Sequence, residues 1–344
     1  MKSTITSVLI SCLFLPDAAS DLSAAEGSTA TTVIVPVERW SNVFGGQDVK
    51  LHFRVVKRKP EPAVEGRIQW HYSANQRTLA RGEAEIDASE ATQIAVILRV
   101  PEVRDGVIFR TQLTVAYVPA RENSATSTLT KTLWLFPEDA FADQRDTLED
   151  RQLLLFDPDG NTAELFAKIE LPHRRIRNAI ALDDREEHSY VIVGEGTSLV
   201  RNRGVAERLL SFAAAGGTVL MLAPSEGVIP MPGEASQKGV ENVAQPGELR
   251  FRQHHVIREF DKRLDSEFLP GTGDFAGSKV TLRTRLNRIG MEVSEDGDWP
   301  WFTIEYPETK GRFVFCGFNI VRNWSNGPAP RYLLNRILTP RPER

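Results

Sequence analysis

Six polar residues stand directly after apolar runs in the second half of the chain, where parallel strands would place them at one edge of a sheet. They are Asp157, Asp159, Glu195, Thr197, Ser225 and Glu226. Ligands of open parallel sheets bind beyond the carboxyl ends of the strands. Carboxylates gathered at such an edge could hold a cation or act as a general acid and base, and a serine there could act as a nucleophile.

The aspartates and the serine also have a structural interpretation. Asp157 or Asp159 could cap a helix that begins near Thr162, because an aspartate before a helix accepts hydrogen bonds from its first backbone N–H groups. Ser225 stands in the segment Ala-Pro-Ser-Glu-Gly, which lacks the first glycine and the following helix of a nucleophile elbow. We therefore favour capping for the aspartates and an ordinary turn for Ser225, with a catalytic Ser225 as the alternative.

The cysteine and histidine pattern predicts neither a reactive thiol nor a metal site. Cys316 lies in the apolar run 313–318, where burial would raise the pKa of its thiol and make it a small hydrophobic residue. His254 and His255 are adjacent, so on a strand they would point to opposite faces, and no further ligand stands at the required spacing. We predict no metal and no cofactor.

Three tryptophans, Trp299, Trp301 and Trp324, gather toward the C-terminus. Exposed aromatic faces provide stacking platforms, so an exposed pair would support contact with sugar rings. Core packing or contact between domains is the alternative that we favour.

Residues 189–227 contain the main strands and helix that would place these polar residues at one edge of the sheet. Residues 190–193 and 218–223 are unbroken apolar runs, typical of parallel strands that are covered on both faces. Val205 and Leu209 fall at helical spacing between them. A strand, helix and strand unit of this length predicts a parallel pair with a right-handed crossover.

The remaining pattern divides the chain into two domains and a linker. Residues 31–137 form six or seven strand-like runs separated by turn signals, which predicts an all-β, immunoglobulin-like sandwich. Residues 138–150 are charged and are interpreted as the interdomain linker. Residues 151–340 combine buried strands with amphipathic helices and predict a three-layer α/β domain, in which residues 225–250 form a long surface loop.

Composition excludes several functional classes. The 344 residues include 42 basic and 46 acidic side chains, and a formal net charge of -4 gives no field that would recruit nucleic acid or an anionic membrane. Two cysteines cannot build a disulfide framework. After the leader, no segment approaches the roughly 20 apolar residues of a membrane span.

Residues 1–25 are typical of a secretory signal peptide. Lys2 precedes the apolar run 8–15, and small residues continue to Ala25. Cys12 ends a segment that resembles a lipobox, but few apolar residues precede it, so we favour cleavage near Ala25 over lipid attachment. The pattern predicts export to the periplasm or the extracellular space.

Several segments of the second half carry a resemblance to a known superfamily. They are the D-x-D-G turn at residues 157–160, then YVIVGEG, FAAAGGTVLML, KGRFVFCGFNI and YLLNRIL. Residues 152–340 resemble the class I glutamine amidotransferase-like superfamily, and are most similar to ThuA-like proteins and to degenerate members attached to sugar-active enzymes. The resemblance implies a flavodoxin-like fold. An active member has a cysteine in a G-x-C-x-G elbow, whereas residues 223–227 contain none.

The front domain has a second resemblance. Its segments WSNVFGGQDVKLHFRV and YSANQRTLARGE are similar to the immunoglobulin-like sandwiches that accompany family 2 glycoside hydrolases. Together the two resemblances imply a link to carbohydrate metabolism.

These features support competing hypotheses. The first is an exported, non-catalytic binding or assembly protein with a degenerate amidotransferase-like domain, whose partner is a glycan or an envelope protein. The alternative is a serine-dependent hydrolase that uses Ser225 with a carboxylate, His254 or His255 at the sheet edge. A third, a purely structural subunit of an envelope assembly, predicts a large exposed apolar patch and no pocket.

Overall fold

The computed structural model describes most of the chain after the predicted leader. The described ranges are 32–38, 40–57, 64–88, 92–120, 125–178, 190–230, 248–253, 256–264, 279–283, 288–292 and 300–339. The predicted signal peptide, with Cys12, lies outside them. So do His254, His255 and Trp299.

The first unit is a β-sandwich of two facing sheets. One has the order β1-β3-β6, with β1 at Thr32–Pro36, β3 at Asp48–Lys57 and β6 at Thr92–Arg99. The other has the order β2-β8-β7-β4-β5, with β2 at Asn42–Phe44, β8 at Ser127–Phe136, β7 at Phe109–Pro119, β4 at Val64–Ala74 and β5 at Arg77–Ala88. Alternate residues of both sheets, such as Leu51, Phe53 and Leu113, are buried in one shared core.

The second unit is built on a mixed sheet of seven strands in the order β10-β9-β11-β12-β18-β17-β14. Their bounds are β9 Leu153–Phe156, β10 Arg174–Ile176, β11 Tyr190–Val193, β12 Thr218–Leu222, β14 Glu248–Arg252, β17 Trp301–Tyr306 and β18 Gly311–Cys316. Neighbours from β10 to β18 in this order are parallel, whereas β17 and β14 are antiparallel. Strand β11, helix α3 (Val205–Ala214) and β12 confirm the predicted strand, helix and strand unit.

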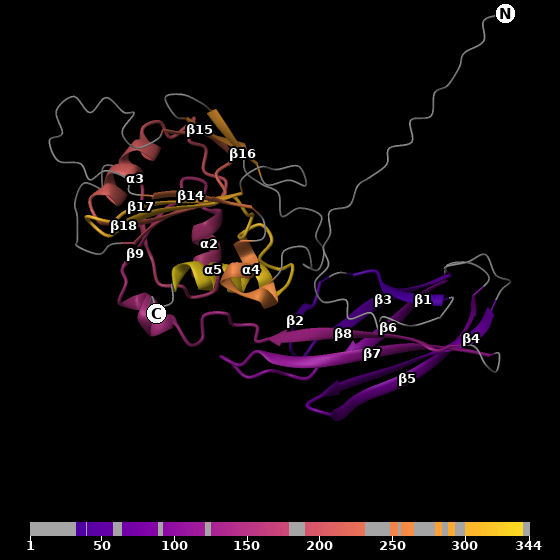
Figure 1. The fold of residues 1–344 in the computed structure, drawn as a ribbon. Helices are drawn as coiled ribbons and strands as arrows, with labels where there is room; N and C mark the ends of the chain where they lie inside the picture. The colour runs from indigo at the N-terminus through magenta and orange to yellow at the C-terminus, as the bar shows by residue number, and fades with distance from the viewer. Residues whose placement is uncertain are drawn as a thin grey trace, which may run out of the picture.

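Helices cover both faces of this sheet (Figure 1). Helix α3 packs in one apolar cluster with residues of the strands, among them Val191 and Phe313. On the other face lie α2 (Asn161–Lys168), α4 (Val256–Phe260) and α5 (Pro328–Leu338), together with the short 3-10 helix η2 (Lys262–Leu264).

The predicted three-layer α/β, flavodoxin-like domain is wrong for this unit. That fold alternates strands with covering helices throughout, whereas the described part of the connection from β12 to β18 is mainly β. It contains β14 and β17 of the large sheet and a separate sheet of β13 (Glu226–Pro230), β15 (Lys279–Arg283) and β16 (Arg288–Glu292). Strands β13 and β14 also replace both ends of the loop predicted at residues 225–250. The described chain as a whole is therefore mainly β, with four sheets.

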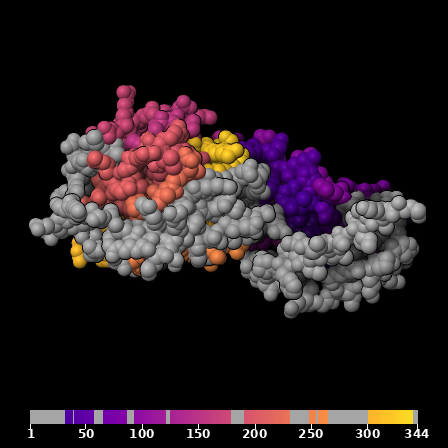
Figure 2. Space-filling view, turned by 90° about the horizontal axis from the view of Figure 1, so that it is seen from above, coloured from indigo at the N-terminus to yellow at the C-terminus, as the bar shows by residue number. Residues whose placement is uncertain are grey.

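The two units share one continuous apolar cluster. Phe44 of β2 and Phe136 of β8 belong to the cluster that also contains Leu333 of α5. Residues 137–150, which include helix α1 (Arg145–Glu149), contribute Phe141 and Leu148. Figure 2 shows the yellow C-terminal residues between the red part of the second unit and the indigo strands of the sandwich. We call this contact of β2, β8 and residues 137–150 with α4, η2 and α5 the junction.

Candidate functional site

Asp157 is a helix cap at the carboxyl edge of the seven-stranded sheet. Its carboxylate accepts hydrogen bonds from the backbone N–H groups of Gly160, at 3.1 Å, and Ala163, at 2.8 Å. The side chain is buried against the neighbouring strand end: a Cβ at Gly194 would lie 2.6 Å from the Asp157 carboxyl carbon. The capping interpretation is therefore confirmed for Asp157.

Glu195 is the buried carboxylate of this edge. It accepts hydrogen bonds from the backbone N–H groups of Val321, at 2.6 Å, and Arg322, at 3.0 Å, and its own N–H donates to the Thr162 hydroxyl. Burial raises the pKa of Glu195 to about 7, although the backbone N–H groups and the charge of Arg322 oppose that rise. Glu195 therefore fastens the segment after β18 to the end of β11.

Thr197 and Glu226 are also bonded within the chain. Thr197 is buried, and its hydroxyl donates to the Gly194 carbonyl at 2.7 Å. The Ser198 hydroxyl donates to the Glu226 carboxylate at 2.7 Å, which links the loop after β11 to β13. Sequence reasoning missed Ser198, although it follows directly after Thr197, one of the predicted residues.

Asp159 faces solvent and forms a surface ion pair. Its carboxylate lies 3.3 Å from Arg201, whose side chain is mostly exposed. Exposed pairs of this kind contribute roughly 0–1 kcal/mol. Among the described residues, no group of three or more His, Cys, Asp or Glu is placed to hold a metal ion.

Ser225 is exposed and has no histidine partner in the described part of the chain. Its backbone N–H donates to the Thr197 carbonyl. The described histidines are bonded elsewhere: His52 to Glu38, His71 to Thr78 and His173 to the Leu171 carbonyl.

Cys316 and the tryptophans belong to the core. Cys316 is completely buried in β18, and burial raises the pKa of its thiol, as predicted. Trp301 and Trp324 are 2% and 8% exposed, so they offer little ring surface to a sugar. Trp324 stacks on Phe141 with ring centroids 6.5 Å apart.

A cleft lies at the junction, and sequence reasoning did not find it. Its volume is about 390 Å³, and its wall includes Asp105, Phe141, Lys168 and Trp324. Arg145 also lines the cleft. Its guanidinium donates to the Asp139 carboxylate and to the carbonyl groups of Ile169 and Glu170, just after α2.

Arg331 of α5 closes another side of this cleft. It donates to the Trp324 carbonyl at 3.0 Å and to the Glu138 carbonyl at 2.9 Å. Its guanidinium carbon lies 4.4 Å from the ring centroid of Phe44, which is a close cation–π contact. One side chain of the second unit thus binds the sandwich and the connecting segment together.

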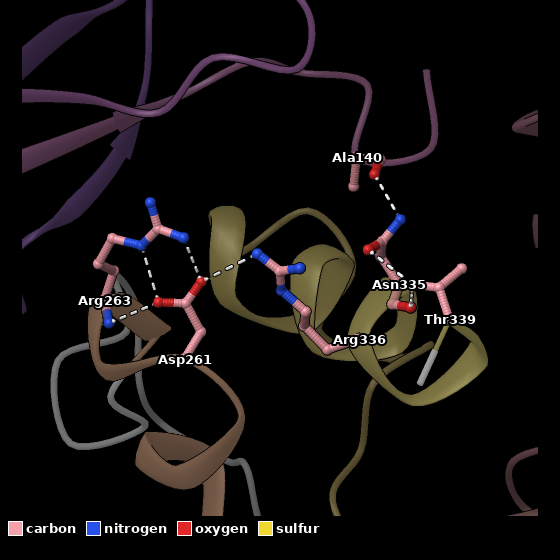
Figure 3. Close-up of polar contacts among 6 residues, drawn as sticks. All are labelled: Ala140, Asp261, Arg263, Asn335, Arg336 and Thr339. Carbon is pink, nitrogen blue, oxygen red and sulfur yellow. Dashed lines mark hydrogen bonds and ion pairs between the residues drawn. The ribbon is translucent and has the colours of Figure 1, made fainter. Parts of the chain in front are cut away.

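An ion network forms around the buried carboxylate of Asp261 at the junction (Figure 3). Asp261 accepts two hydrogen bonds from the Arg263 guanidinium, at 2.8 and 2.6 Å, and lies 3.4 Å from Arg336 of α5. Burial alone would raise the pKa of Asp261, but the two guanidinium groups outweigh it and lower the pKa below its usual value. Asn42 of β2 donates to the Arg263 carbonyl and extends the network into the sandwich.

Helix α5 makes two further polar contacts with the connecting segment. The buried amide of Asn335 donates to the Ala140 carbonyl at 2.8 Å, as Figure 3 shows. The Tyr332 hydroxyl donates to the Pro137 carbonyl at 3.0 Å. These bonds join residues 195 positions apart in the sequence.

One sequence signal does point to the junction. Residues 138–150 carry six carboxylates and one arginine, a larger negative balance than that of the whole chain. The exposed members of this acidic segment are Glu138, Asp143, Asp146, Glu149 and Asp150.

No protein-family model matches the chain, and no curated protein matches it. Solved structures similar to part of it include the periplasmic chaperone SfaE, with 9% identity and a TM-score of 0.24 over 30% of this chain and 57% of that chain. The sporulation control protein Spo0M from Bacillus subtilis has 9% identity and a TM-score of 0.23, covering 32% of this chain and 51% of that chain.

A PapD-like domain of human CEP192 is similar over 38% of this chain and 97% of that domain, with 12% identity and a TM-score of 0.21. The chain thus spans just over half the length of the first two structures. None of these three is described as an amidotransferase, and TM-scores of this size carry no conclusion about function. In the described ranges, no helix has the length and hydrophobicity needed to cross a membrane.

Proposed function

We propose that this chain is an exported, non-catalytic binding or assembly protein. The observation that carries the proposal is that three of the four carboxylates predicted at the edge already accept hydrogen bonds inside the molecule. Asp157 and Glu195 accept backbone N–H groups, and Glu226 accepts the Ser198 hydroxyl. A general acid or base must instead reach the proton of a substrate. The assignment to an exported protein rests on the composition of residues 1–25.

We assign the binding surface to the cleft and the exposed acidic segment beside it. Trp301 and Trp324 are buried, so the feature that would favour a glycan is weak. The exposed carboxylates of residues 138–150 instead complement a basic segment of a partner protein.

Labelling with a fluorophosphonate probe tests this proposal against the hydrolase alternative. The mature protein and S225A are treated in parallel, and intact mass is measured. We expect no adduct on either protein, because Ser225 has no described base. An adduct on the natural chain that is absent in S225A would overturn the non-catalytic assignment.

A binding experiment tests the proposed surface. An oligolysine peptide is titrated into the mature protein at low and high salt, with D143N/D146N/E149Q as the test variant. The matched control, E65Q/E83Q/E85Q, removes the same number of exposed carboxylates from strands β4 and β5. We expect affinity to fall several-fold in the test variant and with added salt, and to change little in the control. Equal losses in both variants would contradict the assignment, and strong binding on a glycan array would favour a sugar partner.

A further inference from the structure

Strand β5 forms an open edge of the sandwich, on the side opposite the junction. It ends the sheet β2-β8-β7-β4-β5, whose other end contacts the second unit through β2 and β8. With 12 residues it is the longest strand at the end of any described sheet, and β4 is its one hydrogen-bonded neighbour in the described ranges. Figure 1 shows β5 at the lower margin of the sandwich. The outer row of backbone N–H and C=O groups on such a strand can pair with a further strand.

The two faces of β5 differ in character. Residues 77–79, 81 and 83–85 are exposed. Small residues at positions 80, 82 and 84 share the face that continues into the core, and Trp70 of β4 covers Gly82 there, because a Cβ at Gly82 would lie 2.6 Å from the Trp70 ring. The outward face carries Arg81, Glu83 and Glu85 in succession. One face therefore offers little steric hindrance to a second strand, and the other offers a pattern of charge.

The order of these charges selects one way for two copies of β5 to pair. An antiparallel pair with a twofold axis places the residue at the axis opposite itself. An axis at Arg81, Glu83 or Glu85 would place like charges opposite each other, and an axis at Ala84 would place Glu83 opposite Glu85. An axis at Gly82 instead places Arg81 opposite Glu83 of the second copy, twice by symmetry. Opposite charges directly across two strands stabilise a sheet, and like charges destabilise it.

A bulge limits the pairing at the start of β5. Tyr72 of β4 is opposite Ala80, whereas Ser73 is opposite Thr78, so Leu79 has no partner on β4. A bulge interrupts the regular spacing of backbone groups, and an axis closer to the start of β5 would have to cross it. The regular residues 80–84 lie after the bulge and are the ones that an axis at Gly82 uses.

We propose that the protein forms a dimer in which residues 80–84 of two β5 strands pair antiparallel about a twofold axis at Gly82. The two five-stranded sheets then become one continuous sheet, with a junction at each outer end. The dimer does not depend on the proposed binding function, although it would give one particle two copies of the acidic segment. An interface of one strand from each copy is small, so the dimer is weak and dissociates on dilution.

The charges of β5 are available for this pairing. The residues opposite Arg81 and Glu83 on β4 are His71 and Gln69, so β4 supplies no opposite charge to either. Gln69 donates a hydrogen bond to Glu83 at 3.5 Å. Charged side chains and bulges also keep edge strands from pairing by chance. Both roles are compatible here, because the same charges oppose the other registers and favour the one about Gly82.

Sedimentation velocity over a wide range of protein concentrations tests the pairing by charge exchange. The natural mature protein should shift from monomer to dimer as its concentration rises. R81E places carboxylates opposite each other and E83R places guanidinium groups opposite each other, so each should weaken the dimer about tenfold. The double variant R81E/E83R exchanges the charges and should restore it. R54E, at an exposed position of β3 in the other sheet, is the matched control and should dimerise like the natural protein.

A natural protein that stays monomeric at all concentrations would overturn the proposal. So would a dimer that R81E and E83R leave unchanged, or one that the folded double variant fails to restore. Cross-linking decides the register if a charge variant does not fold. An equal mixture of A80C and A84C should react with a short thiol cross-linker, because these positions lie opposite each other, whereas either variant alone should not. Cys316 is buried and does not compete.

The dimer and the proposed binding surface can fail independently. The control variant of the oligolysine titration includes E83Q, so that titration is read at protein concentrations at which the natural chain is monomeric. Loss of oligolysine binding would then leave the dimer standing. A monomer at every concentration would likewise leave the acidic segment as the binding surface.

Discussion

Two buried carboxylates, Asp261 at the junction and Glu195 at the carboxyl edge, are stabilised in opposite ways. Asp261 lies between the guanidinium groups of Arg263 and Arg336, and its pKa is lowered. Glu195 meets mainly backbone N–H groups, and burial raises its pKa to about 7. The full positive charges of two guanidinium groups offset the cost of removing the Asp261 carboxylate from water. The backbone N–H groups around Glu195 offset that cost only in part.

This difference separates a permanent contact from an adjustable one. Asp261 has a lowered pKa and stays ionised throughout the neutral range, and its network joins two units of the molecule. Glu195 titrates within that range and holds one segment of a single unit. Asp261 therefore keeps its contribution to stability over the neutral range, whereas the contribution of Glu195 depends on pH there.

The largest effect is expected from D261A. Removing one member of a buried ion network leaves the remaining charges without their partner, which costs about 3 kcal/mol of unfolding free energy. Urea denaturation at pH 7 measures the loss, and D159A, which breaks the exposed pair with Arg201, is the matched control with an expected change below about 0.5 kcal/mol. Similar losses in the two variants would remove the distinction between a buried network and a surface pair.

The second prediction concerns the pH dependence of stability. The folded pKa of Glu195 is raised, so its stabilising contribution is complete below about pH 4.5 and is lost as the pH rises through 7. Between pH 5 and pH 8 this amounts to about 2 kcal/mol, at about 1.4 kcal/mol per pKa unit. Urea midpoints of the natural protein and E195Q at both pH values measure it, and the variant should lose this part of the slope.

Asp261 has the opposite sign in the same experiment. Its folded pKa is lowered, so its contribution is present above its ordinary value of 3.8 and is lost only as the pH falls through the folded pKa. Between pH 5 and pH 8 it should add no slope. A slope in E195Q equal to that of the natural protein would mean that another group titrates there.

The sequence predicts local features of this molecule far better than the junction. The apolar runs at 190–193 and 218–223, the helix between them and the Asp157 cap all depend on residues close in sequence. Hydrophobic periodicity reports such neighbours directly. The strands at the two ends of the loop predicted at 225–250 were missed because they pair across long gaps: β14 with β17, and β13 with β15.

The contacts at the junction join residues that are far apart in the sequence, so hydrophobic periodicity does not reveal them. Tyr332 and Asn335 bond to carbonyl groups 195 positions earlier, and a backbone carbonyl has no sequence signature. Phe141 stands in a charged segment that was interpreted as the interdomain linker, and it is 1% exposed. Glu195 was predicted as a ligand-binding residue, and its backbone partners after β18 were not visible in the sequence.

A smaller effect is expected from D157A. The variant removes the acceptor for the Gly160 and Ala163 N–H groups at the start of α2, and loss of a helix cap costs about 1 kcal/mol. Thermal unfolding followed by circular dichroism measures it. D157N retains a capping oxygen and should recover much of the loss; if it does not, the charge of Asp157 has a role that capping does not explain.

The smallest effect is expected from S225A. The Ser225 side chain is exposed, and the contact it makes with Thr197 uses its backbone N–H, which alanine keeps. The unfolding free energy should change by less than about 0.5 kcal/mol. S198A is the informative comparison, because its hydroxyl bonds to Glu226 and its loss should cost about 1 kcal/mol. Urea denaturation of the two variants measures the contrast. A larger loss in S225A than in S198A would show that Ser225 has a partner beyond the described residues, and the hydrolase alternative would then regain its base.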